Sequence, residues 1–193
     1  MSDDTQYTRQ TVSLASAIQE ATGVALQNCY QCGKCAAGCP VADTMDMPSC
    51  QVLRLLQYET PEFDRQVLQS ESIWLCLACE TCHTRCPQDI GTPKVMNFLR
   101  GEAMRLGLAH PRSKDTQAFH HAFLGSVGRH GRLYEIGMLM GYKMRTGHLL
   151  KDMDLGPKLY EKGRLSLLPH AIEGKASLKR LFNQTLNKPE TKE

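Results

Sequence analysis

Eight of the nine cysteines in this 193-residue chain fall into two runs with the same spacing. The runs are Cys29-x2-Cys32-x2-Cys35-x3-Cys39-Pro40 and Cys76-x2-Cys79-x2-Cys82-x3-Cys86-Pro87. This spacing is the bacterial ferredoxin run, whose thiolates hold [4Fe–4S] clusters. Because the whole run is repeated, proline included, the sequence predicts two [4Fe–4S] clusters.

The spacing also predicts which cysteines share a cluster. Three cysteines at x2 spacing come from one tight loop that curls around the cluster and turns backbone N–H groups toward its sulfurs. The proline after the fourth cysteine fixes φ and turns the chain away. In two-cluster ferredoxins this fourth cysteine ligates the other cluster. The expected ligands are therefore Cys29, Cys32, Cys35 and Cys86 for cluster 1, and Cys76, Cys79, Cys82 and Cys39 for cluster 2.

Zinc and disulfides are the alternative uses of these cysteines. Four-cysteine zinc sites also contain C-x2-C pairs, but a longer spacer usually separates the two pairs. A disulfide framework needs an oxidising compartment. The first residues, MSDDTQYTRQ, are polar and acidic and lack the apolar segment of a signal peptide. We therefore expect clusters on a cytoplasmic chain.

Two further residues lie close to the runs in sequence. Cys50 falls in the first turn of a helix predicted over residues 48–57, where a lone cysteine is most often a small half-buried side chain. His83 lies inside the second run. With four cysteines available, it is expected to be a spacer or a hydrogen-bond donor near the cluster rather than a ligand.

The segments around the runs are predicted to be helical. We find no alternating β-branched stretches that would indicate strands. Apolar periodicity and capping signals predict helices over residues 11–26, over 48–57, from N-cap Thr60 to about Gln69, and from N-cap Thr92 to Gly107. The predicted fold class is mainly α: an alpha-helical ferredoxin-type domain with two clusters, followed by a helical and irregular C-terminal extension.

The chain is expected to divide into four parts. These are an N-terminal helix and leader (1–28), the ferredoxin-type domain (29–108), a docking extension (109–184) and a disordered tail (185–193). Within the extension, helices are predicted over 113–124 and 132–144, separated by a turn at SVGRHG. Residues 146–174 are expected to be irregular and 175–184 helical.

The net charge of +3 conceals two halves of opposite sign. Residues 1–89 carry five Lys and Arg against eleven Asp and Glu, whereas residues 90–193 carry eighteen against nine. The basic half suits packing on the chain's own acidic half or on an acidic partner. Its charges are spread out and accompanied by few aromatics, so nucleic acid is not expected as a partner. No apolar run reaches the roughly 18 residues that span a bilayer.

Motifs for substrate chemistry are missing from the sequence. There is no G-x-G-x-x-G nucleotide fingerprint, no P-loop, and no C-x4-C-x2-C run for a [2Fe–2S] centre. We therefore predict no catalytic residues. The expected role is conduction of electrons between other redox centres.

Three longer segments resemble the C subunit of heterodisulfide reductase. They are CYQCGKCAAGCPVADTMDMPSCQVLRLLQ, WLCLACETCHTRCPQDIGTPKVMNFLR and GRLSLLPHAIEGKASLKRLF, and the resemblance covers about residues 12–184. The eight cluster cysteines of the family fall on the eight cysteines of the two runs without departure.

The resemblance implies an electron-transfer component of an oxidoreductase complex in anaerobic metabolism. In that family, the C subunit relays electrons from a flavin-bearing A subunit to the B subunit, which cleaves a disulfide. This chain lacks the Cys-Cys pair of the B subunit. Two alternatives remain open. One is a free two-cluster ferredoxin-like carrier, which would not need the long extension. The other is the iron–sulfur component of another anaerobic complex, such as a fumarate reductase-like enzyme, which would normally bring a [2Fe–2S] run.

Overall fold

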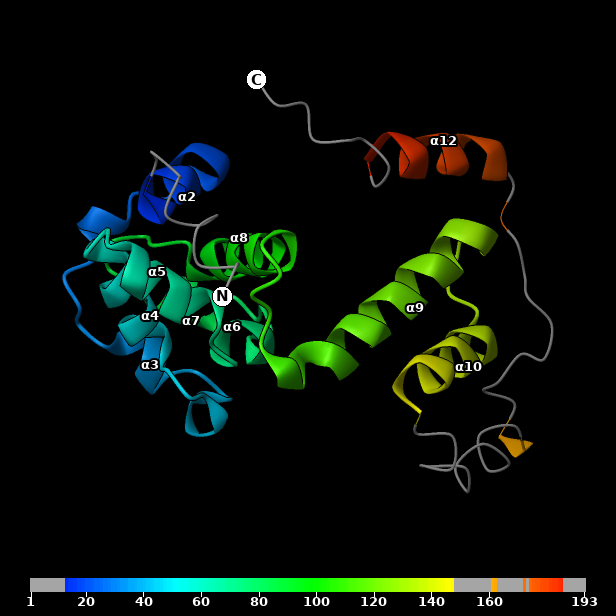
Figure 1. Cartoon of the computed structure of the whole chain (residues 1–193), viewed down its shortest axis with the longest axis horizontal. Coiled ribbons are helices and arrows are strands. Elements are labelled where there is room, and N and C mark those ends of the chain that lie inside the picture. Colours follow the sequence, from blue (N-terminus) through cyan, green and yellow to red (C-terminus); the bar gives the residue numbers. More distant parts are fainter. Residues whose placement is uncertain (1–12, 148–160, 163–171, 173, 186–193) are drawn as a thin grey trace, which may run out of the picture. The chain divides into compact units, whose positions relative to one another are not determined.

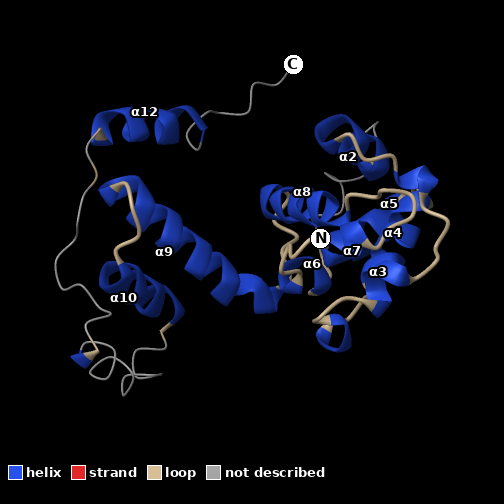
Figure 2. Ribbon diagram, turned by 180° about the vertical axis from the view of Figure 1, so that it is seen from behind, coloured by secondary structure: helices blue, strands red, loops and turns tan. Residues whose placement is uncertain are grey.

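The computed structural model describes residues 13–147, 161–162, 172 and 174–185. Within these residues every regular element is a helix (Figure 2). The mainly helical fold class is thereby confirmed. The chain separates into two compact units, residues 1–113 and 114–193, each of which is considered by itself.

The first unit consists of α-helices and 3-10 helices (η) that surround the two cysteine runs (Figure 1). In chain order these are α2 (Leu14–Thr22), η1 (Leu26–Asn28), α3 (Lys34–Ala37), η2 (Ala42–Thr44), α4 (Ser49–Gln57), α5 (Pro61–Leu68), α6 (Ser72–Leu75), α7 (Thr81–Thr84), α8 (Thr92–Arg105) and η3 (Pro111–Ser113). The predicted helices at 48–57 and 60–69 are confirmed to within a residue or two. The predicted first helix is shorter, because Gly23 ends it in the left-handed conformation with φ of 74°.

The core of this unit forms around α8 and α4. Helix α8 packs against α2, α5, α6 and α7, and α4 packs against α2, α3, α5 and η1. Four of the five residues expected on the apolar stripe of α8, namely Val95, Met96, Leu99 and Ala103, are fully buried, whereas Leu106 follows the last helical residue and is partly buried. Both cysteine runs are thereby anchored to one core, since α3 and α7 lie within them.

The start of α8 differs from the prediction by one residue. Gly91 rather than Thr92 is the N-cap, and Thr92 is the first helical residue. The Thr92 hydroxyl points back to the Ile90 carbonyl at 3.5 Å. The predicted end is confirmed, because the helix stops at Arg105 and Gly107 has a φ of 67°.

The second unit contains α9 (Lys114–His130), α10 (Glu135–Thr146) and α12 (Lys175–Thr185). The predicted turn at SVGRHG is wrong, because α9 continues through Gly125 and Gly128 to His130. A close contact explains this: a Cβ on Gly128 would lie 3.1 Å from the Phe182 ring of α12, so the glycine allows close packing. The turn comes later, at Gly131, where φ is 81°.

Of the remaining predictions for the second half of the chain, one can be compared with the structure and two fall largely outside the described residues. The helix predicted over 175–184 is confirmed. The irregular stretch predicted over 146–174 lies largely outside the described residues, as does nearly all of the tail from residue 185. Among the described residues, none of the helices has the length and apolar character required to cross a membrane.

Candidate iron–sulfur centre

The two cysteine runs share one backbone conformation as well as one spacing. In the first loop Gln31 and Gly33 have positive φ angles of 62° and 76°. The equivalent residues of the second loop, Ala78 and Glu80, have φ of 51° and 61°. Non-glycine residues rarely adopt this left-handed conformation, and when they do they cluster at functional sites. Such turns point successive N–H groups into an anion-binding concavity.

Short helices place the third and fourth cysteines of each run. Cys35 lies in α3, and Cys82 lies in α7. These two helices pack against each other. Cys39 and Cys86 follow directly after them. The contact between α3 and α7 therefore brings the end of each run close to the other loop.

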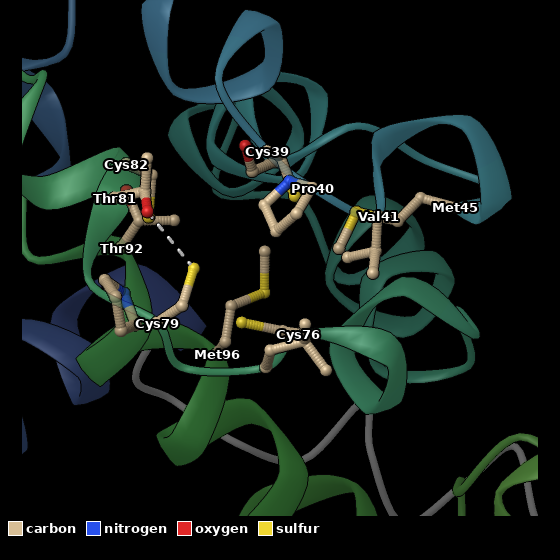
Figure 3. A pocket seen from close by; sticks show the side chains of 13 residues that line it. Cys39, Pro40, Val41, Met45, Cys76, Cys79, Thr81, Cys82, Thr92 and Met96 are labelled. Atoms are coloured by element: carbon tan, nitrogen blue, oxygen red, sulfur yellow. Dashed lines mark hydrogen bonds between the residues drawn. The ribbon is translucent and has the colours of Figure 1, made fainter.

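The sulfurs line two separate cavities. The first cavity is lined by Cys29, Cys32, Cys35 and Cys86. The second is lined by Cys39, Cys76, Cys79 and Cys82, whose side chains surround it from several segments (Figure 3). Each cavity thus contains three cysteines of one run and the fourth cysteine of the other.

The lining of both cavities suits a four-iron cluster. Such a cluster takes one thiolate per iron, so its four sulfurs surround a core instead of converging on one atom. In the described part of the chain, no three His, Cys, Asp or Glu side chains converge closely enough to hold a single metal ion. None of the nine cysteines forms a disulfide bond in the structure. Apolar side chains, including Val41, Met45 and Met96, also line the second cavity and limit the access of water to it.

Several sulfurs already have hydrogen-bond partners. The Ile90 backbone N–H donates to Cys86 Sγ at 3.3 Å, and the Gln31 side-chain amide donates to Cys29 Sγ at 3.5 Å. In the second loop, Cys79 Sγ lies 3.4 Å from Thr81 Oγ1. Hydrogen bonds to cluster sulfurs are among the factors that set a reduction potential.

The thiol environments differ from one cysteine to another. Burial raises the pKa of the Cys82 thiol to about 11, and the neighbouring Cys76 contributes in the same direction. Hydrogen bonding to the Thr81 hydroxyl and backbone instead lowers the pKa of the exposed Cys79. A metal-free Cys82 is therefore protonated at neutral pH, and metal binding must release that proton.

Asp46 connects the loop after the first run to the helix that leads into the second. Its carboxylate accepts hydrogen bonds from the backbone N–H groups of Glu71 at 3.1 Å and Ser72 at 2.9 Å, and from the Ser72 hydroxyl at 2.5 Å. Burial opposes ionisation, but these hydrogen bonds outweigh it and hold the pKa of Asp46 below its usual value. Asp46 thereby fixes the start of α6, which ends just before Cys76.

Arg100 holds Cys76 through its backbone. Its guanidinium, on α8, donates hydrogen bonds to the backbone carbonyls of Ile73 and Cys76. Burial lowers the pKa of this side chain, and the nearby Cys76 opposes that effect. A positive charge is therefore fixed beside the first cysteine of the second run.

Each cavity reaches the surface at the second cysteine of its run. Cys32 and Cys79 are exposed, whereas the other cysteines of the runs are half-buried. Large apolar side chains stand beside them, with Tyr30 58% exposed and Leu77 63% exposed.

Three residues beside the runs differ in how they lie with respect to the two cavities. Cys50 is half-buried, as predicted, but it also lines the first cavity as a fifth cysteine. Ser49, which sequence reasoning missed, lines the second cavity. His83 lines neither cavity, and its Nε2 lies 3.3 Å from Asp89 Oδ1.

Comparison with known proteins identifies this region. The family described as "4Fe-4S dicluster domain" matches residues 25–90. The matched residues include both cysteine runs. The prediction of two [4Fe–4S] clusters as cofactors is thereby confirmed.

The chain is also similar to the C subunits of several heterodisulfide reductases, which confirms the resemblance noted in the sequence. The C subunit of the ferredoxin:CoB-CoM heterodisulfide reductase of Methanosarcina acetivorans is 35% identical over 47% of this chain and 35% of its own length. The iron–sulfur C 2 subunit of the CoB–CoM heterodisulfide reductase of Methanocaldococcus jannaschii is 28% identical over 63% of each chain. The C2 subunit of the H(2)/formate:CoB-CoM heterodisulfide,ferredoxin reductase of Methanococcus maripaludis is 34% identical over 42% of each.

The similarity does not extend over the whole of these relatives. The chain spans 35% to 63% of their lengths.

Proposed function

We propose that this chain is the electron-transfer component of a heterodisulfide reductase-like complex. It relays single electrons through its two clusters between a flavin-bearing A subunit and a disulfide-cleaving B subunit. The observation that carries the proposal is the pair of four-cysteine cavities within one helical core. The similarity to several C subunits supports the choice of complex.

The proposed ligands follow the crossed assignment. Cluster 1 is held by Cys29, Cys32, Cys35 and Cys86, and cluster 2 by Cys76, Cys79, Cys82 and Cys39. The lining of the two cavities supports this assignment, because each contains one of these sets. The chain's own contribution is to hold the thiolates, exclude water and place hydrogen bonds at the sulfurs. When bound, the clusters supply the one-electron chemistry.

The two exposed loops support a relay with separate entry and exit. Cluster 1 reaches the surface at Cys32 and cluster 2 at Cys79, each next to an exposed apolar side chain. We expect one loop to face the electron donor and the other to face the acceptor. A cytoplasmic location, expected from the sequence, is part of the same proposal.

Anaerobic co-purification tests the function. The tagged chain is isolated from its native organism without oxygen, and its partners are identified by mass spectrometry. We expect A-like and B-like subunits in stoichiometric amounts. A chain that is recovered fully loaded with iron but always without such partners would instead favour a free carrier.

A further inference from the structure

The second cavity contains a hydroxyl without a partner. Ser49 is only 3% exposed, and its side-chain oxygen is buried with no hydrogen-bond partner among the described residues. This residue lines the cavity together with Cys39, Cys76, Cys79 and Cys82. Leaving a buried hydroxyl without a partner is destabilising. The orphaned group therefore points to an acceptor inside the cavity.

The other hydroxyls that line this cavity are already engaged. Thr81 Oγ1 lies 3.4 Å from Cys79 Sγ, and Thr92 Oγ1 donates to the Ile90 carbonyl at 3.5 Å. Ser49 differs from both threonines, because its hydroxyl has no hydrogen-bond partner among the described residues.

The backbone around Ser49 favours a negatively charged occupant. Ser49 is the first residue of α4, a helix of nine residues, and its N-cap Pro48 makes no side-chain capping bond. The first N–H groups of a helix lack intrahelical partners and carry a partial positive charge. An iron–sulfur cluster with its four thiolates is an anion, and it gains from both the helix end and the hydroxyl.

We propose that Ser49 donates an O–H···S hydrogen bond to a sulfur of the cluster in the second cavity and thereby raises its reduction potential. This inference rests on the second run holding a cluster, as in the proposed function. A donor to the cluster stabilises the reduced form more, because that form carries the additional negative charge. Ser49 is a tuning residue of this cluster and not one of its ligands.

Cys50 provides a matched control one residue away. Its side chain lines the first cavity, among Cys29, Cys32, Cys35 and Cys86. Cys50→Ala alters the same helical turn as Ser49→Ala but removes an atom from the other site. A general loosening of the start of α4 would therefore affect both variants alike.

The experiment is an EPR-monitored redox titration of the full chain with both clusters loaded. Cys79→Ser is titrated first, because replacing a second-run thiolate shifts the potential of that cluster whichever run supplies its fourth ligand. Ser49→Ala is expected to shift the same potential to a more negative value. Loss of one hydrogen bond to a charged group weakens reduction about tenfold, which for a one-electron couple is about 59 mV. Cys50→Ala is expected to leave that potential unchanged.

The proposal is overturned if Ser49→Ala leaves the second cluster's potential unchanged, or if it shifts both potentials equally. Ser49→Cys keeps a weaker S–H donor and is expected to give a smaller negative shift, which also provides a test if the alanine variant loads poorly. A chain in which these shifts occur but which never associates with other subunits would contradict the proposed function alone.

Discussion

Cys39 and Cys86 are the residues on which the ligand assignment depends. Each lines a cavity together with three cysteines of the opposite run. Cys39→Ala is expected to remove a ligand from cluster 2 and to leave cluster 1 intact, whereas Cys86→Ala does the reverse. EPR spectra of the reduced single variants, compared with variants of Cys32 and Cys79, identify the damaged cluster. Loss of the cluster of the same run would contradict the crossed assignment.

Gly33 allows the backbone strain of the first cysteine loop to be measured. Its φ of 76° is unfavourable for a side chain, although a Cβ there would meet no atom within 4 Å. Gly33→Ala is therefore expected to lower the free energy of unfolding by about 1–2 kcal/mol through backbone strain alone. Anaerobic urea denaturation measures this change.

Gly101 is the matched control for Gly33. It lies inside α8, also with open space around a new Cβ, but without a positive φ. Gly101→Ala is expected to raise the free energy of unfolding by roughly 0.5–1 kcal/mol. If both substitutions changed stability in the same direction, the strain assigned to the loop would be wrong.

The sequence predicted site residues that lie close to one another along the chain. It missed residues whose partners lie far away in sequence. The eight cysteines repeat at short intervals along the chain, so their pattern is visible without a structure. Asp46 and Arg100 act on groups 24–27 residues away in sequence, and no local pattern marks such pairs. Ser49 looks like an ordinary first residue of a helix until the cavity beside it is known.

Among the helices, the sequence predicted which segments are helical better than it predicted where each helix begins and ends. Helices α4, α5 and α8 have clear apolar stripes and were predicted to within a residue or two. Helix α9 was predicted too short, because glycines usually indicate a turn. The packing of Gly128 against Phe182 overrides that local preference, and only the tertiary structure reveals it.

Substitution of Asp46 tests whether its carboxylate stabilises the start of α6. Asp46→Asn removes the charge that accepts the Glu71 and Ser72 hydrogen bonds, and the effect resembles the loss of a helix cap, roughly 1 kcal/mol. Because the pKa of Asp46 is lowered in the folded state, its contribution is fully present above the unfolded value of about 3.9. The contribution is lost as pH falls through the lower, folded value.

The measurement is urea denaturation of the wild type and Asp46→Asn across this pH range. The difference between them should be constant from neutral pH down to about 5 and should disappear only as the pH falls through the lowered pKa of the folded carboxyl. Ser70, whose hydroxyl also reaches Asp46 at 3.4 Å, offers a milder control as Ser70→Ala. A difference that persists unchanged in acid would mean that the charge of Asp46 is not what holds α6.

For the whole molecule, the charge distribution predicts how the chain meets its partners. Residues 90–193 carry a net charge of +9, and residues 1–89 carry −6 before any cluster is bound. If the basic half docks on an acidic partner, association should slow by about tenfold between low and high salt. Stopped-flow association kinetics at several ionic strengths measure this.

Reversing one charge in each half of the chain tests which half docks on the partner. Arg129 is exposed on α9, and Arg54 is exposed on α4. Arg129→Glu should slow association and flatten the salt dependence, whereas Arg54→Glu should change both much less. Equal effects of the two variants would argue against docking through the basic half.

The relay of electrons is the central claim, and a single-turnover experiment tests it most directly. The complex of this chain with its A-like and B-like partners is mixed anaerobically with the electron donor, and the clusters of each component are followed by freeze-quench EPR. We predict that both clusters of this chain are reduced before those of the B-like partner, and that a complex assembled without this chain fails to reduce that partner. Reduction of the B-like partner at an unchanged rate in the absence of this chain would contradict the account.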